Sequence, residues 1–245
     1  MIELVNLTKR YGRTLAVDHL NLTVEKGELF GFIGPNGAGK TTTLRMMAGI
    51  LGATEGTIAI AGIDVAEYPE KAKKIIGFIP DRPFLYEKLT GMEFMGFIGA
   101  LYGVAEEDFP VRAEELLQRF SLYDWGDHLI ESYSHGMKQR LIIASALLHD
   151  PEIIIVDEPM VGLDPAGIRM VKNIFRGLAD NGVTIFMSTH TLEIAADLCD
   201  RIGIIHRGRM IALGTTGDLR GTARLNEGDL EEVFLRLTGS GEETL

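Results

Sequence analysis

The stretch that decides the fold of this chain is Gly34-Pro35-Asn36-Gly37-Ala38-Gly39-Lys40-Thr41. It follows a short apolar run at residues 29–33 and precedes a run of helical character at residues 42–48. A strand, a glycine-rich loop and a helix in this order are the context in which the pattern G-x-x-x-x-G-K-[ST] binds phosphate groups. A flexible glycine loop could match the pattern by chance, but it would not supply the flanking strand and helix.

The residue types in this loop explain the expected chemistry. Three glycines let the backbone curl so that several N–H groups point into one hollow at a helix N-terminus, where an anion is favoured. Lys40 can reach the outer phosphates of a nucleotide, and the Thr41 hydroxyl can bind a magnesium ion that bridges them. The sequence therefore predicts a P-loop that binds a nucleoside triphosphate together with Mg²⁺.

The composition excludes several classes of protein. Hydrophobic residues make up 46% of the 245 residues, which suffices for a buried core, and the net charge of −11 argues against general binding of nucleic acid. No run approaches the ~20 apolar residues of a membrane span, and the N-terminus lacks the features of an export signal. We expect a soluble, cytoplasmic protein that reaches a membrane only through a partner. The single cysteine, Cys199, fits a reducing compartment and is expected to be a small buried residue rather than a nucleophile.

The pattern along the chain predicts an α/β fold: a P-loop NTPase core with a mainly parallel sheet. Strand-like runs at residues 2–24 and 57–60 indicate an N-terminal antiparallel β subdomain. From about residue 86 to residue 150 the apolar spacing becomes helical, which predicts an inserted α-helical subdomain. Strands and helices then alternate, so we expect one domain over residues 1–240. An amphipathic helix at residues 229–237 and a loose tail at residues 241–245 complete the prediction.

The apolar run at residues 153–156 is followed by two carboxylates, Asp157 and Glu158. A continuous apolar run is typical of a buried parallel strand, and its carboxyl end is where α/β sheets bind ligands. Asp157 can hold Mg²⁺ there, directly or through water. Glu158, on the other side of the strand, can orient and deprotonate an attacking water. Alone, the two residues could be solvated acids at a strand end, but the P-loop favours the catalytic interpretation.

A further motif, Tyr133-Ser134-His135-Gly136-Met137, precedes a helix-like run. Ser134 is a natural N-cap, and Gly136 permits close approach of the backbone to a ligand. The same pattern is also typical of an ordinary capped helix.

Together these motifs resemble the ATP-binding-cassette (ABC) ATPases, in the right order and over essentially the whole chain. The Walker A motif of that family falls on Gly34 to Thr41, with Thr42 also near the phosphates. Its Walker B motif falls on residues 153–157, and its signature motif falls on Ser134 to Met137. The resemblance implies that Glu158 is the catalytic base and that Lys40 contacts the phosphates.

The remaining family motifs fall on single residues. The A-loop aromatic, which stacks on adenine, is Tyr11, and the Q-loop falls at Asp81. The D-loop covers residues 162–165 and includes Asp164, and the switch histidine is His190. Taken alone, Tyr11 could be ordinary packing, His190 a core histidine, and Asp164 the start of a helix.

The resemblance also implies a mechanism and partners. ATP and Mg²⁺ are the expected ligands, with Thr41, Asp81 and Asp157 near the metal. Two copies of the chain would face head to tail, each ATP lying between the P-loop of one copy and Ser134 and Gly136 of the other. ATP binding would close this interface and hydrolysis would open it, which would drive separate membrane permease subunits from the inner face of the cell membrane.

Two departures from the family pattern refine this interpretation. Asp81 stands where the family has glutamine, and the signature has Tyr133, His135 and Met137 in place of leucine, glycine and glutamine. The form Tyr-Ser-x-Gly-Met resembles the export-type branch, as does the C-terminal stretch from residue 229 to residue 239. We expect residues 81–102 to form the groove for a permease helix; aromatic and methionine residues there are candidates for its surface, although some belong to the core: Phe84, Tyr86, Met92, Phe94 and Met95.

Two other hypotheses stay open at this point. The chain could be a non-transport ATPase that acts on DNA or ribosomes, against which stand its acidic charge, its single cassette and the short span between P-loop and signature. It could also be a module that senses ATP without hydrolysing it. Asp81 is the only support for that hypothesis, and Glu158 and His190 oppose it.

Overall fold

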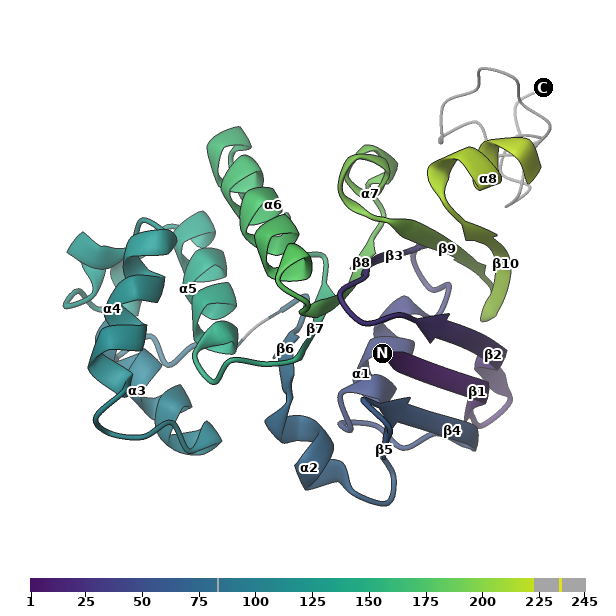
Figure 1. Cartoon of the computed structure of the whole chain (residues 1–245), viewed down its shortest axis with the longest axis horizontal. Helices are drawn as coiled ribbons and strands as arrows, with labels where there is room; N and C mark the ends of the chain where they lie inside the picture. Colours follow the sequence, from purple (N-terminus) through teal and green to yellow (C-terminus); the bar gives the residue numbers. More distant parts are fainter. Residues whose placement is uncertain (83, 223–233, 235–245) are drawn as a thin grey trace.

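Two sheets organise the chain in a computed structural model that describes residues 1–82, 84–222 and 234 (Figure 1). The first sheet is antiparallel, in the order β2-β1-β4-β5. Its strands are β1 (Ile2–Tyr11), β2 (Thr14–Val24), β4 (Glu55–Ile60) and β5 (Ile63–Asp64). The predicted N-terminal antiparallel β subdomain is therefore confirmed.

The second sheet has the order β10-β9-β3-β8-β7-β6 and is parallel except for β10. Its strands are β3 (Leu29–Ile33), β6 (Ile76–Ile79), β7 (Ile153–Asp157), β8 (Thr184–Thr189), β9 (Arg201–His206) and β10 (Arg209–Gly214). The side chains of β3, β7 and β8 are buried throughout, because helices cover both faces of a parallel sheet. The apolar runs at residues 29–33 and 153–156 have this cause.

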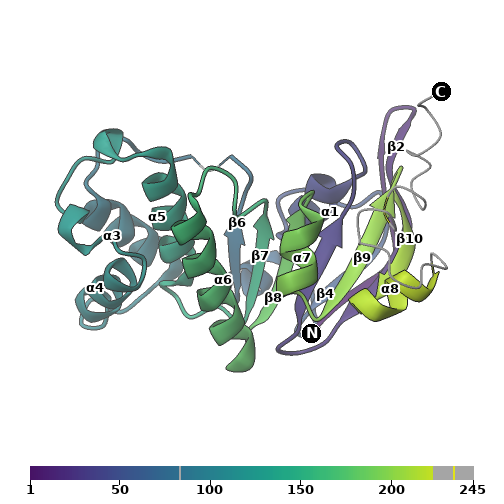
Figure 2. The same cartoon turned by 90° about the horizontal axis from the view of Figure 1, so that it is seen from above.

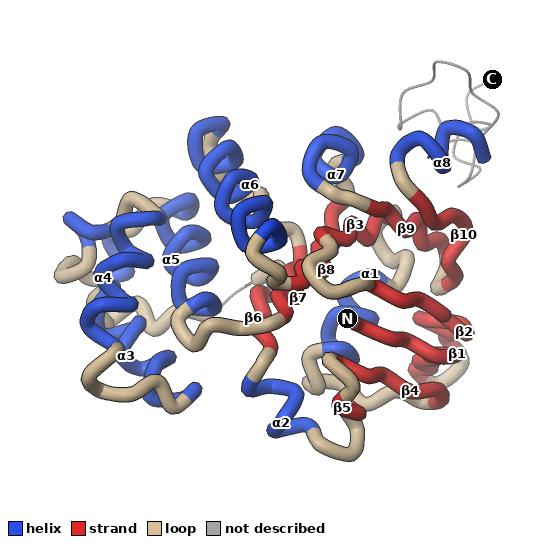
Figure 3. Tube along the Cα trace, in the orientation of Figure 1, coloured by secondary structure: helices blue, strands red, loops and turns tan. Residues whose placement is uncertain are grey.

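Helices fill the space around the two sheets (Figure 2). Those that flank the sheets are α1 (Lys40–Met47), α2 (Pro69–Lys74), α6 (Pro165–Asp180), α7 (Leu192–Leu198) and α8 (Thr216–Thr222). Three others, α3 (Gly91–Tyr102), α4 (Phe109–Arg119) and α5 (His135–Leu147), gather at the end of the molecule opposite the antiparallel sheet (Figure 3). Short 3-10 turns, Tyr123–Trp125 and Ile130–Ser132, lie between α4 and α5.

Two apolar clusters join these parts. One contains Leu44 and Met47 of α1 together with residues of both sheets, so α1 packs between the sheets. The other runs from Phe94 in α3 through α5 to Ile154 in β7, so the three-helix segment shares a core with the parallel sheet. The parallel sheet and helix α5 therefore share one continuous hydrophobic core, which fixes the position of the start of α5 relative to the sheet edge.

The structure decides boundaries and exposures in the helical segment. Helix α5 begins at His135, as predicted from Ser134 as N-cap, and the Ser134 side chain accepts a hydrogen bond from the Met137 N–H. Phe94 and Met95 are buried, whereas Phe84 is 77% exposed. Cys199 is partly buried, and burial raises the pKa of its thiol, as expected for a packing residue. The predicted helix at residues 229–237 lies outside the described residues apart from Phe234.

Candidate functional site

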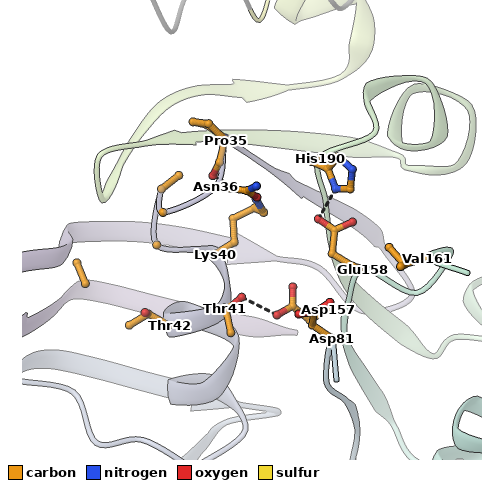
Figure 4. A pocket seen from close by; sticks show the side chains of 14 residues that line it. Pro35, Asn36, Lys40, Thr41, Thr42, Asp81, Asp157, Glu158, Val161 and His190 are labelled. Carbon is orange, nitrogen blue, oxygen red and sulfur yellow. Dashed lines mark hydrogen bonds and ion pairs between the residues drawn. The ribbon is translucent and has the colours of Figure 1, made fainter. Parts of the chain in front are cut away.

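A hollow of about 290 Å³ opens where α1 begins and β7 ends, at the carboxyl edge of the parallel sheet (Figure 4). Many of the residues singled out in the sequence line it. The lining consists of Ala16, Pro35, Asn36, Gly37, Ala38, Gly39, Lys40, Thr41, Thr42, Asp81, Asp157, Glu158, Val161 and His190.

The loop between β3 and α1 has a shape that only glycine permits at two positions. A methyl group on Gly34 would lie 2.4 Å from the Ile205 carbonyl oxygen, and one on Gly39 would lie 2.4 Å from the Ala16 carbonyl oxygen. Gly39 also has φ +109°, which L side chains rarely adopt. The backbone therefore curls tightly at the start of α1, where unpaired N–H groups favour an anion. This cradle fits a phosphate chain.

Lys40 extends into this hollow without an anionic partner. Its Nζ donates to the carbonyl oxygens of Gly34 at 2.6 Å and Pro35 at 3.3 Å. The residue is only 7% exposed, and burial lowers the pKa of its amine, although Glu158 and Asp157 oppose the shift. Among the described residues, no carboxylate lies within ion-pair distance of Nζ. A buried cation with only neutral acceptors is suited to an incoming anion.

Asp157 joins the P-loop helix to the sheet. The carboxylate is buried; its Oδ2 accepts from the Thr41 hydroxyl at 2.7 Å, and its Oδ1 accepts from the Ser188 hydroxyl at the end of β8. Asp157 and Thr41 thus present oxygen atoms side by side, which is the donor chemistry that Mg²⁺ prefers. These residues fit the predicted metal site.

Glu158 and His190 form a second pair at the same edge. The Nδ1 atom of His190 lies 2.9 Å from Oε1 of Glu158, and the Thr189 hydroxyl donates to Oε2 at 3.2 Å (Figure 4). Glu158 has φ +53°, and its N–H donates to the Ser188 carbonyl oxygen at 3.1 Å. A left-handed conformation is unusual outside glycine and turns the chain sharply where β7 ends. The turn aims the Glu158 carboxylate into the hollow.

Asp81 lies beside Asp157 on the floor of the hollow (Figure 4). Its side chain is 47% exposed, and its closest cation, Arg82 Nε, is 4.0 Å away. The pair is exposed and long, so it fixes Asp81 only weakly.

Five of the predicted residues do not line this hollow: Gly34, Tyr11, Ser134, Gly136 and Asp164. Tyr11 is 49% exposed at the end of β1, with Lys9 Nζ 5.3 Å from its ring centroid. Asp164 caps α6 by accepting from the Gly167 N–H at 2.8 Å. Ser134 is exposed and caps α5. The structure thus brings the P-loop and the strand-end residues together but leaves the signature motif elsewhere.

Tyr133 holds the signature motif in place. Its hydroxyl donates to the Trp125 carbonyl oxygen at 2.6 Å, and burial, with help from the charge of Asp127, raises its pKa to about 12. A methyl group added to Gly91 would lie 2.3 Å from the Tyr133 hydroxyl oxygen. Tyrosine in place of the family's leucine therefore ties the motif to the 3-10 turn and to the start of α3.

Sequence reasoning missed Ser188 and Thr189, which donate to Asp157 and Glu158. The signal was present, because two hydroxyl residues directly follow the apolar part of β8. What the sequence did not reveal is that β7 and β8 are neighbours with Asp157 opposite Ser188.

The fold and this site define a P-loop nucleotide-binding protein. Residues 17–161 match the model of the ABC transporter family. Similar curated proteins include the linearmycin resistance ATP-binding protein LnrL of Bacillus subtilis (39% identity; 98% of this chain, 76% of LnrL). They also include the daunorubicin/doxorubicin resistance protein DrrA of Streptomyces peucetius (41%; 92% of this chain, 68% of DrrA). In YbhF of Escherichia coli, a probable multidrug ABC transporter ATP-binding protein, the match (36% identity) spans 97% of this chain but 41% of the relative.

Solved structures agree. An ATP-binding subunit of an ABC transporter superposes with a TM-score of 0.91 at 34% identity, over 97% of this chain and 99% of that chain. A dimeric post-hydrolysis state of the cassette MJ0796, bound to ADP and Pi, gives 0.78 at 27% identity, over 88% of this chain and 98% of that chain. The chain belongs to the ABC transporter family and is an ATP-binding ATPase subunit. Within the described residues, no helix is long and apolar enough to cross a membrane.

Proposed function

We propose that this chain hydrolyses ATP with Mg²⁺ and that the energy drives a separate export-type permease. The observation that carries the proposal is the cluster of a buried, anion-free Lys40, the Thr41–Asp157 pair and the Glu158–His190 pair at one sheet edge. Each of these groups has the chemistry that phosphoryl transfer to water needs. The Glu158–His190 contact favours turnover over passive sensing of nucleotide.

Each residue of the site has a separate role. The N–H groups of the loop at residues 34–39 and the Lys40 ammonium bind the outer phosphates, and Thr42 lies beside them. Thr41 and Asp157, with Asp81 on the floor, would hold Mg²⁺, which when bound neutralises charge on the phosphates. Glu158 accepts the proton of the attacking water, and His190 orients the Glu158 carboxylate. Tyr11 stacks on the adenine from the rim.

The exposed signature motif acts on a second copy of the chain. Ser134 and Gly136 lie outside the hollow of their own chain, so they are free to contact the nucleotide of another. The head-to-tail arrangement satisfies this need and uses Asp164 at the interface. The dimeric solved structures of similar cassettes support it. Such a C2 dimer contains two equivalent composite sites.

The permease groove was expected at residues 81–102; of these, Leu101 and Tyr102 line a groove of about 450 Å³ between α2, β6 and the end of α3, which is the proposed permease site. Ile50 and Leu101, which both line the groove, are 59% and 66% exposed, and grouped apolar exposure is typical of an interaction site. Lys73 and Lys74 outnumber the one carboxylate, Glu70, among the charged residues that line the groove. The chemistry fits a permease helix with an apolar face and an acidic residue. The resistance and transport functions in the names of several relatives support export as the direction.

The first experiment measures ATP hydrolysis with and without Mg²⁺ for the wild type and Glu158→Gln. Loss of the general base should lower turnover by about 10²–10⁴-fold, while ATP is still bound and the dimer accumulates. Glu152→Gln, at the opposite end of β7, is the matched control. Hydrolysis by Glu158→Gln at the wild-type rate would refute the assigned base.

The second experiment purifies the tagged protein from detergent-solubilised native membranes and identifies the proteins that co-purify with it. A multi-spanning protein in near-equal amount is expected, and Leu101→Glu should lose it while ATP hydrolysis persists. Val111→Glu, on the exposed face of α4, is the control for an added charge. Recovery of ribosomes or DNA-bound proteins instead would contradict the permease assignment.

A further inference from the structure

The first turn of α5 lies directly against the loop that comes after the catalytic base. This loop, residues 159–163, connects Glu158 to the start of α6. The Gln139 side chain, only 4% exposed, donates from Nε2 to the Pro159 carbonyl oxygen at 3.4 Å. A methyl group on Gly136 would lie 3.2 Å from the Gly162 carbonyl oxygen. The signature motif is therefore in contact with the 159–163 loop of its own chain.

His135 makes the tightest of these contacts. A methyl group on Gly162 would lie 2.0 Å from Nδ1 and 2.4 Å from Cε1 of the His135 ring. Real side-chain atoms do not approach so closely, so the ring occupies the space that any side chain at position 162 would need. Gly162 also has φ +78°. Glycine is thus required at position 162 for two independent reasons, one of which is His135.

The 159–163 loop is short and internally hydrogen-bonded. A movement of its Gly162 end would therefore also move its other end, next to Glu158. The Val161 N–H donates to the Glu158 carbonyl oxygen and the Leu163 N–H to the Met160 carbonyl oxygen, both at 3.3 Å. Val161 lines the nucleotide hollow, and Leu163 packs against the core shared with α5. A small shift of the backbone at residues 159–163 would therefore change the position of the Glu158 carboxylate.

We propose that His135 is a positioning residue that clamps the 159–163 loop, and with it Glu158, to the signature motif of the same chain. The inference rests on the proposed function: the signature motif faces the partner's ATP, whereas Glu158 acts on the ATP of its own chain. The clamp makes the two sites of a dimer respond together, because the segment that contacts one nucleotide carries the base that acts on the other. Gly162 is the socket for the ring.

A double-mutant cycle tests the clamp. His135→Ala should lower kcat by about threefold to tenfold with KM for ATP unchanged, since a small misplacement of the base affects chemistry rather than P-loop binding. Gly162→Ala should lower kcat by at least about tenfold, because the new methyl group displaces the ring and the loop together. In the double variant the part of the cost of Gly162→Ala that comes from the clash with the ring should disappear, whereas the part that comes from φ +78° remains, so the two effects should combine to less than their product. Effects that multiply, within about twofold, would overturn the proposal.

Two further variants separate shape from charge and from backbone strain. His135→Phe keeps a flat ring over Gly162 without a titratable nitrogen and should retain most of the activity. If it loses as much as His135→Ala, the imidazole acts chemically, not as a clamp, and the proposal fails. Gly103→Ala is the matched control for strain, because Gly103 has φ +74° with nothing within 4 Å of the added methyl group. It should cost stability but leave kcat unchanged.

Hydrogen exchange provides a readout that needs no hydrolysis. Without nucleotide, His135→Ala should increase deuterium uptake at residues 159–163 relative to the wild type, and His135→Phe should not. Unchanged uptake in His135→Ala would overturn the clamp, whatever the activity. A wild type that shows the protected loop but hydrolyses no ATP would instead refute the proposed function and leave the contact established.

Discussion

The P-loop edge and the signature motif are built in opposite ways. At the P-loop edge the functional groups come from three neighbouring segments and bond to one another: Thr41 to the buried Asp157, and His190 to Glu158. In the signature motif, Ser134 is exposed and uses its side chain only to cap α5. One region is assembled within a single chain, whereas the other faces away from the hollow of its own chain. In the head-to-tail dimer that we propose, a site divided in this way would be active only as a dimer.

Mixing two inactive variants tests most directly whether the two regions serve different chains. Lys40→Ala removes the phosphate-binding cation, and Ser134→Asp keeps a helix cap but places a negative charge against the partner's phosphate. Each variant alone should lose about 10²-fold or more in turnover, since each destroys both sites of its dimer. The mixture should recover up to roughly a quarter of wild-type activity, because half the dimers would hold one intact site.

Ser134→Asn is the matched control in that experiment, because it caps the helix without charge and should stay closer to the wild type. ATP hydrolysis in the mixed and separate samples is the measurement. A mixture that remains as inactive as its components would mean that the P-loop and signature motif of one chain serve the same nucleotide.

A second variant tests whether the P-loop edge of a single chain supplies the ligands for Mg²⁺. Thr41→Val removes the hydroxyl that meets Asp157 and should raise the Mg²⁺ concentration for half-maximal hydrolysis by about tenfold. Binding of ATP in the presence of a chelator should change little. A Mg²⁺ titration of hydrolysis measures the shift, with Thr57→Val in the antiparallel sheet as control. An unchanged titration would remove Thr41 from the metal site.

Asp81 offers a smaller effect at the border between the two regions. Asp81→Asn keeps the shape of the side chain and removes its charge, so turnover should fall by about threefold to tenfold if the carboxylate helps to hold Mg²⁺ or the attacking water. Steady-state kinetics at saturating ATP and Mg²⁺ measure it. Wild-type turnover in Asp81→Asn would show that this departure from the family's glutamine has no catalytic part.

The smallest effect concerns the contact between α3 and the parallel sheet, away from both regions. His149 stacks on Tyr102 of α3, with ring centroids 3.8 Å apart, and its Nε2 lies 3.2 Å from the Ile76 carbonyl oxygen of β6. Burial lowers the pKa of His149 below its ordinary value of 6.5. Below pH 6.5 the unfolded chain therefore binds a proton that the folded chain resists, so this contribution to stability is complete above that pH and declines as the pH falls.

Urea unfolding at pH 7.5 and pH 5.5 measures the loss. The wild type should lose more stability than His149→Phe, by at most about 1 kcal/mol for each pH unit. Equal losses would mean that His149 is as easily protonated in the folded protein as in the unfolded chain, and that water reaches its ring between α3 and β6.

Local patterns predicted most of the elements around the site. The strand, loop and helix at residues 29–47 and the strand ending in Asp157 were correct, because apolar runs and glycine positions are properties of short segments. The contacts of Asp157 with Ser188, and of His135 with Gly162, depend on which segments become neighbours, and this is decided by the whole sheet and the shared core. The sequence predicted that some of the aromatic and methionine residues at 84–95 are core residues, but for the same reason it could not say that Phe94 and Met95 are among them.

The left-handed backbone conformation of Glu158 could not be predicted from the sequence either. A positive φ at glutamate runs against its local preference and persists only because the Ser188 carbonyl and the strands around it hold the chain there. The roles assigned to individual residues remain predictions that the proposed experiments address.

The hydrogen bonds of Lys40 to the Gly34 and Pro35 carbonyl oxygens have a consequence for the speed and cost of nucleotide capture. Through these bonds the ammonium group holds the loop in the curved conformation that binds phosphate. Little backbone freedom then remains to be lost on association, so the entropic cost of ordering the loop is met during folding. In the function that we propose, nucleotide exchange at the P-loop would then be rapid, and the opening and closing of the two chains would be the slow step of each cycle.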